Sequence, residues 1–519
     1  MANPLVSGLG TAQECICGLV GCIFTMAASS APARTPGKVV PPRLNPVRVP
    51  VPEQPPEERV HNFGEIVRSY SLEDAVLEAK RCIQCRRPWC VEACPITQDC
   101  REYIRLLAER DFDGAARVTL REDPLANVLC KVCYHYCEDA CVVKKKGVPI
   151  AIRELKRSSL ELGNADLTYV PGRPRNQRVA VIGGGPAGIM AAWELGIRGY
   201  SVTVFEQEDI LGGLAMTIPK YRMTEADLRK DLERFRNLDV KFQTHTKVGV
   251  VFPPEKLLQE GYEAVFISIG TSLHRTLGIP GEDLPGVFPA LKLLKDVNKG
   301  HPVTLGRRIV VIGGGDVAMD SVRSAVRLSP GGDVTLIYRR TEAEMPADKE
   351  EVKGAREEGI HFVFQKAPVR IIGNGHVEGI VLESMELGPP DSSGRRRPVP
   401  IPGSEETLPC DTVIVAVGQR ADLTGYGSQF DLKIAPGGWP EGKGPDLATG
   451  VEGVFAGGGK SVVYAMAAGT RGAEAIDAYL RKKKGEAPQP RPDPFGGTTP
   501  FQLPAGYTRA NLNPNPVSG

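Results

Sequence analysis

Two glycine-rich turns, each set between an apolar strand-like run and a helix-like run, constrain the fold most strongly. In the first, the run RVAVI leads into Gly183, Gly185 and Gly188. Gly183 allows the tight turn, Gly185 lets the backbone approach a pyrophosphate, and Gly188 lets helix and strand pack closely. Pro186 and Ala187 lie in the turn, and the helix-like run begins at Ile189; its N-terminus faces the phosphates with free N–H groups. The segment predicts a βαβ dinucleotide-binding unit.

The second strand of this unit ends in an acidic residue. Residues 201–205 form the run SVTVF, and Glu206 follows it, eighteen residues past Gly188. An acid at this position binds ribose hydroxyl groups. A lone glycine motif is weak, but strand, helix and acid are all in register here, so the prediction is specific.

The second turn has the same form. Gly313 and Gly315 take the first two glycine positions, Asp316 opens the helix, and Ala318 is the permitted third small residue. Each feature matches the first turn, so the chain is expected to bind two dinucleotides, as a flavoprotein reduced by nicotinamide would.

The second strand of this second unit ends in Arg339 and Arg340 rather than in an acid. A carboxylate there would favour NAD(H), whereas paired guanidinium groups suit a 2′-phosphate. The sequence therefore favours NADP(H) over NAD(H). A solvated basic loop is the alternative interpretation.

Further glycines follow other apolar strands. One strand ends at Gly270 and a near echo of it at Gly418, which suggests one domain interrupted by another. Near the end of the chain, Gly458 and Gly459 precede an Ala-rich helical run, whose N-terminus is expected to face flavin phosphates.

Eight of the thirteen cysteines fall into two closely spaced groups: Cys82, Cys85, Cys90, Cys94, and then Cys130, Cys133, Cys137, Cys141. A disulfide framework suits short secreted chains, and this one is long with no convincing signal peptide. Zinc is the serious alternative, because C-x2-C pairs also build tetrahedral zinc sites. The C-x3-C-P spacing of the first group favours iron–sulfur, since in two-cluster ferredoxins such a cysteine ligates the other cluster.

Charge and hydropathy exclude some classes of function. With 64 basic and 62 acidic residues the net charge is +2, so there is no surplus for a nucleic-acid backbone. No window offers the ~20 apolar residues of a membrane span. We therefore expect a cytoplasmic protein without a nucleic-acid partner or a membrane span.

Together these motifs resemble the glutamate synthase small (beta) subunit family, which is shared with the N-terminal part of dihydropyrimidine dehydrogenase and the large subunit of ferredoxin:NADP transhydrogenase. The resemblance covers residues 52–482. The runs that carry it, besides the two glycine turns, are ERVHNF (58–63), AKRCIQC (79–85), YRR (338–340), EMPA (344–347) and VFAGG (454–458). It implies one FAD, one NADPH and two 4Fe–4S clusters.

By match of position, the resemblance assigns the cysteines to the two clusters. One cluster would be held by Cys82, Cys85, Cys90 and Cys141, and three corners of the other by Cys94, Cys133 and Cys137. The family's fourth ligand is a Gln or Glu where this chain has Lys156, which cannot ligate iron while protonated. Glu154 and Cys130 are the substitutes nearby in sequence.

Two further departures from the family lie in segments expected beside the flavin. Gly459 stands where the family has an Asp, and the loop at residues 212–219, which includes Gly213, is one residue shorter. Arg222, just after this loop, is expected to shape the flavin pocket; a solvated turn is the alternative.

The sequence predicts an α/β protein in which a helical two-cluster domain precedes two Rossmann-like domains, the NADPH domain being inserted in the FAD domain. The predicted limits are 52–175 for the helical iron–sulfur domain, 176–299 and 405–484 for the FAD domain, and 300–404 for the NAD(P)H domain. Residues 1–51 are expected to be a flexible extension. The Pro-rich tail, 485–519, is expected to be a partner-docking arm or disordered.

The expected function is that of an oxidoreductase subunit that takes hydride from NADPH onto FAD and passes single electrons through the clusters to a partner. Hydride transfer between cofactors requires no protein acid–base, so no catalytic side chain is expected. The partner would be a glutamate synthase large subunit, a ferredoxin, or a bifurcating or hydrogenase-type complex, and reverse flow also fits. A cluster- or zinc-bearing scaffold and a nucleotide sensor without turnover are the alternatives from other classes.

Overall fold

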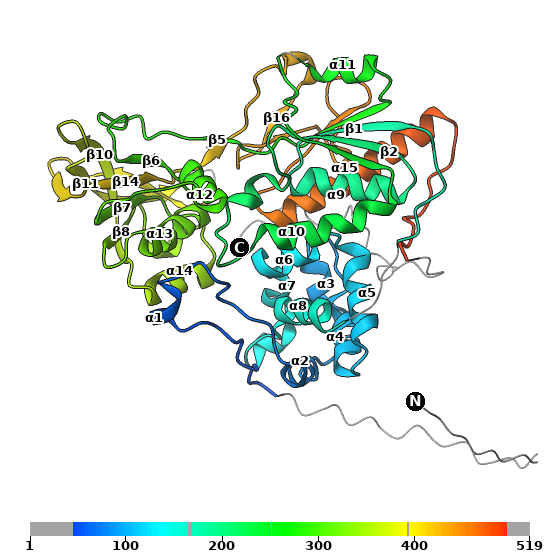
Figure 1. Cartoon of the computed structure of the whole chain (residues 1–519), viewed down its shortest axis with the longest axis horizontal. Helices are drawn as coiled ribbons and strands as arrows, with labels where there is room; N and C mark the ends of the chain where they lie inside the picture. The colour runs from blue at the N-terminus through cyan, green and yellow to red at the C-terminus, as the bar shows by residue number, and fades with distance from the viewer. Residues whose placement is uncertain (1–44, 164–168, 251, 392–393, 496–519) are drawn as a thin grey trace, which may run out of the picture. The chain divides into compact units, whose positions relative to one another are not determined.

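The computed structural model describes residues 45–163, 169–250, 252–391 and 394–495. Its N-terminal part is built from short helices (Figure 1). These are α1 (Pro56–Arg59), α2 (Leu72–Ala79), α3 (Trp89–Ala93), α4 (Cys100–Ala108), α5 (Phe112–Glu122), α6 (Ala126–Val132), α7 (Tyr136–Asp139), η1 (Val142–Lys145) and α8 (Ile152–Leu162). Ser71, Asp99 and Asp111 accept hydrogen bonds from first-turn N–H groups and so fix where α2, α4 and α5 begin.

A parallel five-stranded sheet follows, in the order β18-β4-β1-β2-β3. Its strands are β1 (Arg178–Ile182), β2 (Ser201–Phe205), β3 (Val240–Gln243), β4 (Ala264–Ile267) and β18 (Val454–Ala456). The helical elements that accompany it are α9 (Pro186–Ile197), η2 (Gly213–Thr217), α10 (Glu225–Leu232), η3 (Glu233–Asn237), α11 (Pro254–Gln259), η5 (Ser428–Phe430) and α15 (Val462–Lys483). Because the strands are parallel, all their carboxyl ends meet at one edge.

A second parallel sheet has the order β6-β14-β7-β8-β9. Its strands and helices are β6 (Val287–Pro289), α12 (Ala290–Lys299), β7 (Arg308–Ile312), α13 (Asp316–Leu328), β8 (Asp333–Tyr338), η4 (Glu342–Glu344), α14 (Lys349–Glu357), β9 (His361–Phe364) and β14 (Thr412–Val415). The remaining strands are antiparallel: β10 (Lys366–Ile372), β11 (Gly379–Pro390), β12 (Arg396–Pro400), β13 (Glu406–Pro409), β5 (Leu273–His274) with β15 (Gln419–Arg420), and β16 (Lys433–Ile434) with β17 (Pro440–Glu441).

The chain enters the second sheet after β4 and returns to the first sheet at β18, which confirms the predicted α/β fold with one Rossmann-like unit inserted in another. However, two strands of the second sheet lie outside the limits of 300–404 that the sequence predicts for the NAD(P)H domain. β6 precedes residue 300 and β14 follows residue 404, yet both pair within the second sheet. Local sequence does not separate β14 from β4, because both are buried apolar strands that end near a glycine.

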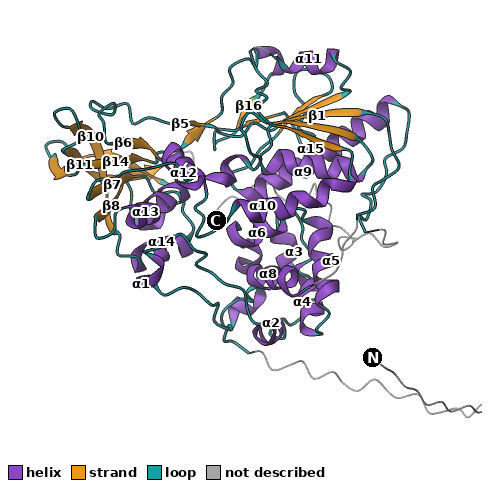
Figure 2. Cartoon of the chain, in the orientation of Figure 1, coloured by secondary structure: helices purple, strands orange, loops and turns teal. Residues whose placement is uncertain are grey.

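The helical part and the first sheet share one hydrophobic core. Leu125, Val128 and Leu129, on or beside α6, belong to the same buried cluster as Trp193 of α9 and Val463 of α15. Figures 1 and 2 show α9 and α15 lying between the first sheet and the N-terminal helices. These two parts are therefore joined by apolar burial, which is not directional but strong in sum.

Parts of both predicted terminal segments pack against the folded chain. Arg48 forms an ion pair with Glu138, so the end of the predicted flexible extension is held on the helical part. Arg491 pairs with Glu194 of α9, and Phe495 stacks on Tyr169 at 4.7 Å between ring centroids. Arg491 and Phe495 of the Pro-rich tail therefore pack on the folded chain. Residues 1–44 and 496–519 lie outside the described residues.

The second-sheet part meets the rest of the chain through charges. The buried Glu358 carboxylate lies 2.9 Å from Arg59 of α1, and 2.6 Å and 2.7 Å from Arg323 and Arg327 of α13. Arg222, which precedes α10, also forms ion pairs with Asp320 of α13 and Glu351 of α14. Among the helices that the structure describes, none is both long and apolar enough to cross a membrane.

Replacing Glu358 by Gln should destabilise the fold strongly. The change leaves buried guanidinium groups without their shared anion, which costs about 3–5 kcal/mol when one partner of a buried pair is removed. Urea unfolding followed by circular dichroism measures this. Glu342→Gln is the matched control, since Glu342 and its partner Arg356 are both exposed and the loss there should stay within about 1 kcal/mol. Equal losses for the two variants would contradict the prediction.

Candidate functional site

The first glycine turn, at the carboxyl end of β1, is closed at two glycines and open at one. A Cβ on Gly183, whose φ is +102°, would lie 2.5 Å from the Ser268 carbonyl oxygen, and one on Gly188 would lie 1.9 Å from the Gly183 oxygen. A Cβ on Gly185 would meet nothing nearer than the Gly213 Cα, at 3.9 Å. The structure thus leaves space in front of the second glycine, beside the N-terminus of α9.

Glu206 lies against this turn, directly after β2. Its carboxylate accepts hydrogen bonds from the backbone N–H groups of Gly184, at 2.7 Å, and Glu208, at 2.8 Å. The acid and the first cradle, formed by Gly185 and Gly213, therefore occupy the same edge of the sheet. This is the geometry needed to hold the ribose and pyrophosphate of a dinucleotide.

The second turn repeats the first. A Cβ on Gly313 would lie 2.3 Å from the Ala416 carbonyl oxygen, whereas one on Gly315 would meet nothing nearer than the Pro346 Cγ, at 3.9 Å. Ala318 takes the close-packed third position, where its Cβ lies 3.2 Å from the site of a Gly313 Cβ. The open space at Gly315, called the second cradle below, lies at the N-terminus of α13.

Asp316, the first residue of α13, joins the second cradle to the helical part. Its carboxylate accepts a hydrogen bond from the Asp348 N–H at 2.9 Å and another from the Tyr134 hydroxyl. Burial raises the pKa of Asp316 to about 7. Tyr134 directly follows Cys133, so a cysteine of the helical part lies one residue from a contact with the second cradle.

The paired arginines after β8 differ in their surroundings. Arg340 is buried, forms an ion pair with Asp391 at 2.7 Å, and donates to the Arg396 carbonyl. Arg339 is exposed at the strand end, and burial of part of its side chain together with the neighbouring Arg340 lowers its pKa. Arg339 is therefore the guanidinium available to a ligand, and Arg340 supports the strand end.

The remaining predicted glycines lie where strands of the two sheets end. Gly270 follows β4 and has open space, and Gly418, with φ +109°, follows β14 of the second sheet. Gly458 packs against the Trp439 ring, and Gly459 packs against the start of α15, where a Cβ would lie 2.3 Å from the Ala465 nitrogen. Gly459 is thus a packing requirement of this chain, which accounts for the missing acid.

Arg222 lies in an ion-pair network between the two sheets' helices. It contacts Asp320 of α13 at 2.8 Å and Glu351 of α14 at 2.9 Å, and its side chain is largely buried. Arg222 therefore holds α13 and α14 through these ion pairs rather than lying in a solvated turn. Local sequence could not reveal the two acids, because they come from distant parts of the chain.

In the structure the cysteines group differently from their order in the sequence. The first cysteine group, as the term is used from here on, is Cys82, Cys85, Cys90 and Cys141, which line one pocket with Trp89. Burial raises the pKa of the Cys82 thiol to about 12, and the other three cysteines raise it further. Thiols in such a place ionise only when a metal supplies the compensating positive charge. Four cysteine side chains that line one pocket fit a metal centre.

The second cysteine group, as the term is used from here on, is Cys94, Cys133 and Cys137. Burial raises the pKa of Cys133 to about 12, and Cys94 adds to this shift; Cys137 interacts with both. At the same place, Lys156 of α8 forms a buried ion pair with Asp123 and interacts electrostatically with Cys94 and Cys133. Burial lowers the pKa of Lys156, but Asp123 more than reverses this and the pKa is raised.

Neither sequence-based substitute ligand joins the second group. Cys130 and Glu154 both line a different pocket, beside Arg157 and Arg222. The Cys130 thiol donates to the Asn127 carbonyl at 3.3 Å, and Glu154 pairs with Arg153 at 2.8 Å. Both side chains are therefore directed elsewhere.

Two contacts of the second group could not be located from sequence. Cys100, 1% exposed at the start of α4, interacts with both Cys90 of the first group and Cys137 of the second. Tyr136 packs edge-on against Tyr464 of α15 at 5.3 Å between ring centroids. Tyr464 also interacts with Cys94 and Cys133. The second group is thus the one beside α15, and Cys100 lies between the two groups.

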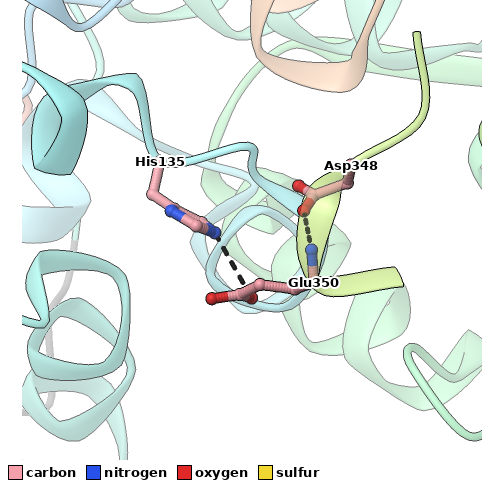
Figure 3. A group of neighbouring side chains, drawn as sticks. All are labelled: His135, Asp348 and Glu350. Carbon is pink, nitrogen blue, oxygen red and sulfur yellow. Dashed lines mark hydrogen bonds and ion pairs between the residues drawn. The ribbon is translucent and has the colours of Figure 1, made fainter. Parts of the chain in front are cut away.

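His135, between the cysteines of the second group, points at α14 (Figure 3). Its Nε2 lies 3.4 Å from Glu350, while the Asp348 carboxylate accepts from the Glu350 N–H. The ligand atoms of these three residues lie within 4.8 Å of one another. Arg153 already pairs with Glu350 at 3.1 Å, so the arrangement is an ion-pair contact between helical part and second sheet rather than a cation site.

Comparison with known protein families matches nearly the whole described chain. Residues 177–472 match the pyridine nucleotide-disulphide oxidoreductase family, and residues 59–166 match dihydropyrimidine dehydrogenase domain II, 4Fe-4S cluster. Among solved structures, FprA of Mycobacterium tuberculosis in complex with NADPH has a TM-score of 0.52 and 22% identity, covering 61% of this chain and 87% of that one. This likeness concerns the fold.

Relatives of known sequence are subunits of redox enzymes. The glutamate synthase (NADPH) small chain of Halomonas elongata is 35% identical, covering 82% of this chain and 95% of the relative. The NADP(+)-dependent formate dehydrogenase subunit beta of Moorella thermoacetica is 38% identical, and the NADPH-Fe(3+) oxidoreductase subunit beta of Geobacter sulfurreducens 37%. The alignments cover 76% of this chain in both cases, but only 60% and 64% of those two relatives. Two open dinucleotide cradles beside two cysteine groups, together with these matches, show that the chain belongs to the pyridine nucleotide-disulphide oxidoreductases, in the family of the glutamate synthase small chain.

Proposed function

We propose that the chain is the electron-transfer subunit of an NADPH-dependent oxidoreductase, with FAD at the first cradle, NADPH at the second and 4Fe–4S clusters at the cysteine groups. The observation that carries the proposal is the matched pair of cradles, each open only in front of its second glycine. When bound, FAD accepts hydride from NADPH and releases single electrons to iron–sulfur centres. The family match to a 4Fe-4S domain supports iron–sulfur over zinc.

The chain's own residues bind and orient. At the first cradle, N–H groups of α9 face the pyrophosphate across Gly185, and Glu206 binds the ribose. The N-terminus of α15, after Gly458, supplies a second set of free N–H groups at the same edge. At the second cradle, α13 serves the pyrophosphate and Arg339 the 2′-phosphate.

The order of the cysteine groups gives a direction to the proposed electron path. The second group lies beside Tyr464 of α15, on the side of the first cradle, and Cys100 lies between it and the first group. Beside the first group, Trp89 and Ile83 are 43% and 44% exposed. We place the exit to a redox partner at this exposed apolar edge.

An anaerobic visible-absorbance titration of the purified chain tests the proposal. Addition of NADPH should bleach the flavin band first and then the broad iron–sulfur absorbance, at much lower concentration than NADH. No flavin band with bound iron and sulfide would indicate a scaffold, and nucleotide binding without flavin would indicate a sensor; either result would overturn the proposal.

Replacing each open glycine by valine should separate the two dinucleotide sites. Gly185 and Gly315 both have extended backbone (φ −78° and −101°) that valine adopts readily, and the added methyl groups enter the open cradles. Gly185→Val should abolish FAD retention, measured by released flavin. Gly315→Val should keep FAD but raise the KM for NADPH at least about tenfold, because a tenfold loss needs only about 1.4 kcal/mol.

Thermal unfolding of the FAD-free proteins is the control for these two variants. The unfolding temperatures should stay close to that of the unchanged chain. Loss of FAD from both variants alike would contradict the assignment of separate sites.

Substitution of Arg339 should weaken the choice between NADPH and NADH. Arg339→Gln removes the available guanidinium, so kcat/KM for NADPH should fall about tenfold or more while that for NADH stays nearly constant, since a charge-assisted phosphate contact is worth about 1.5–3 kcal/mol. Arg370→Gln, an exposed arginine of β10 paired with Glu405, should leave both values unchanged. Equal losses for both nucleotides with Arg339→Gln would refute a 2′-phosphate role.

A further inference from the structure

The second cysteine group differs from the first in the number of its thiols. Four cysteines converge in the first group, whereas in the second Cys94, Cys133 and Cys137 share their surroundings with the Lys156–Asp123 ion pair. The inference drawn from this difference rests on the proposed function, because it assumes that the cysteine groups bind clusters.

The ion pair cannot supply the missing ligand. A lysine ammonium has three donors and no acceptor, so it offers no lone pair to iron. The Asp123 carboxylate is already used on both oxygens: one accepts from the Leu125 N–H at 3.0 Å and the other from Lys156. Its side chain is fully buried and held in this arrangement.

Among the residues that the structure describes, no other nearby side chain with ligand character takes the place of the ion pair. Cys130 and Glu154 line a separate pocket together with Arg222. Cys100 is buried where Cys137 faces Cys90 of the first group, whereas the ion pair lies beside Cys94 and Cys133. His135 is turned toward Glu350 (Figure 3).

We propose that the second cluster is held by three thiolates only, with the Lys156–Asp123 ion pair facing its fourth iron, so that this iron has no protein ligand and is exchangeable. An iron held by sulfide bridges alone is released more easily than one with a thiolate ligand. The first cluster, with four thiolates, serves as an internal reference on the same chain.

Controlled oxidation of the intact holoprotein tests the proposal. Under argon, with a chelator present, one equivalent of ferricyanide should take one electron from the second cluster; one Fe²⁺ leaves, and a 3Fe–4S centre with three ferric ions remains. Iron per chain should fall from about eight to about seven, as expected for two four-iron clusters that lose one atom between them. The electron paramagnetic resonance signal of an oxidised three-iron centre should appear in parallel.

Restoring the iron completes this test. Addition of Fe²⁺ and dithionite should return the iron content and remove the three-iron signal. Loss of no iron, or equal loss from both clusters, would overturn the inference while leaving the proposed function intact. Absence of iron and sulfide from the purified chain would instead overturn the proposed function itself.

A variant that supplies a ligand gives the sharper comparison. Lys156→Gln places an amide oxygen at the fourth corner, and combining it with Asp123→Asn avoids leaving a buried carboxylate unpaired. The double variant should keep its iron under the same oxidation and show at least about a tenfold weaker three-iron signal, which corresponds to about 1.4 kcal/mol. Lys146→Gln, an exposed lysine after η1, is the matched control and should lose iron like the unchanged chain. Iron loss from the double variant equal to that of the control would overturn the role of Lys156.

Discussion

The apolar core shared by the N-terminal helices and the first sheet fixes the distance between the cysteine groups and the first cradle. Side chains from α6, α9 and α15 belong to one buried cluster, and Trp193 lies within it without exposure to solvent. Interiors of this density have little freedom to shift. One-electron transfer depends steeply on separation, so a core that holds α15 against the second cysteine group is the constraint on which the proposed path depends.

The second sheet is attached in a different way. Its contacts with the helical part include Glu358 with Arg59, Glu350 with His135 and Arg153, and Asp316 with Tyr134. Ion pairs and hydrogen bonds are directional and exchange more readily with water than apolar packing does. The part that would receive a diffusing nucleotide is thus held by directional polar contacts, whereas the part that would hold a resident flavin is held by apolar packing.

The sequence was most informative where sterics dictate residue type. Gly183 and Gly188 are recognisable because backbone oxygens block their Cβ positions, that of Ser268 for Gly183 and that of Gly183 itself for Gly188. The αβ order and the inserted unit follow from the order of strand-like and helix-like runs, whereas the grouping of Cys141 with Cys82, Cys85 and Cys90 came from the family resemblance. The different surroundings of Arg339 and Arg340 do not follow from local sequence, since Asp391, which pairs with Arg340, comes just after β11 and about fifty residues later in the chain. Asp123 and Lys156 likewise meet only through the fold, as do the acids that bind Arg222.

Tyr134 and Asp316 have a bearing on how chains of this family can be recombined. The tyrosine is adjacent to a cysteine of the second group, and the aspartate opens the helix of the second cradle. Consider a chimera whose nucleotide-binding segment comes from another family member. The natural crossover points for such an exchange are the paired strands β5 and β15. Such a chimera keeps both sheets whole, but Tyr134 loses its partner unless the donor segment also has a hydrogen-bond acceptor at the start of α13. Compatibility across this contact, rather than the integrity of either sheet, therefore decides which exchanges succeed.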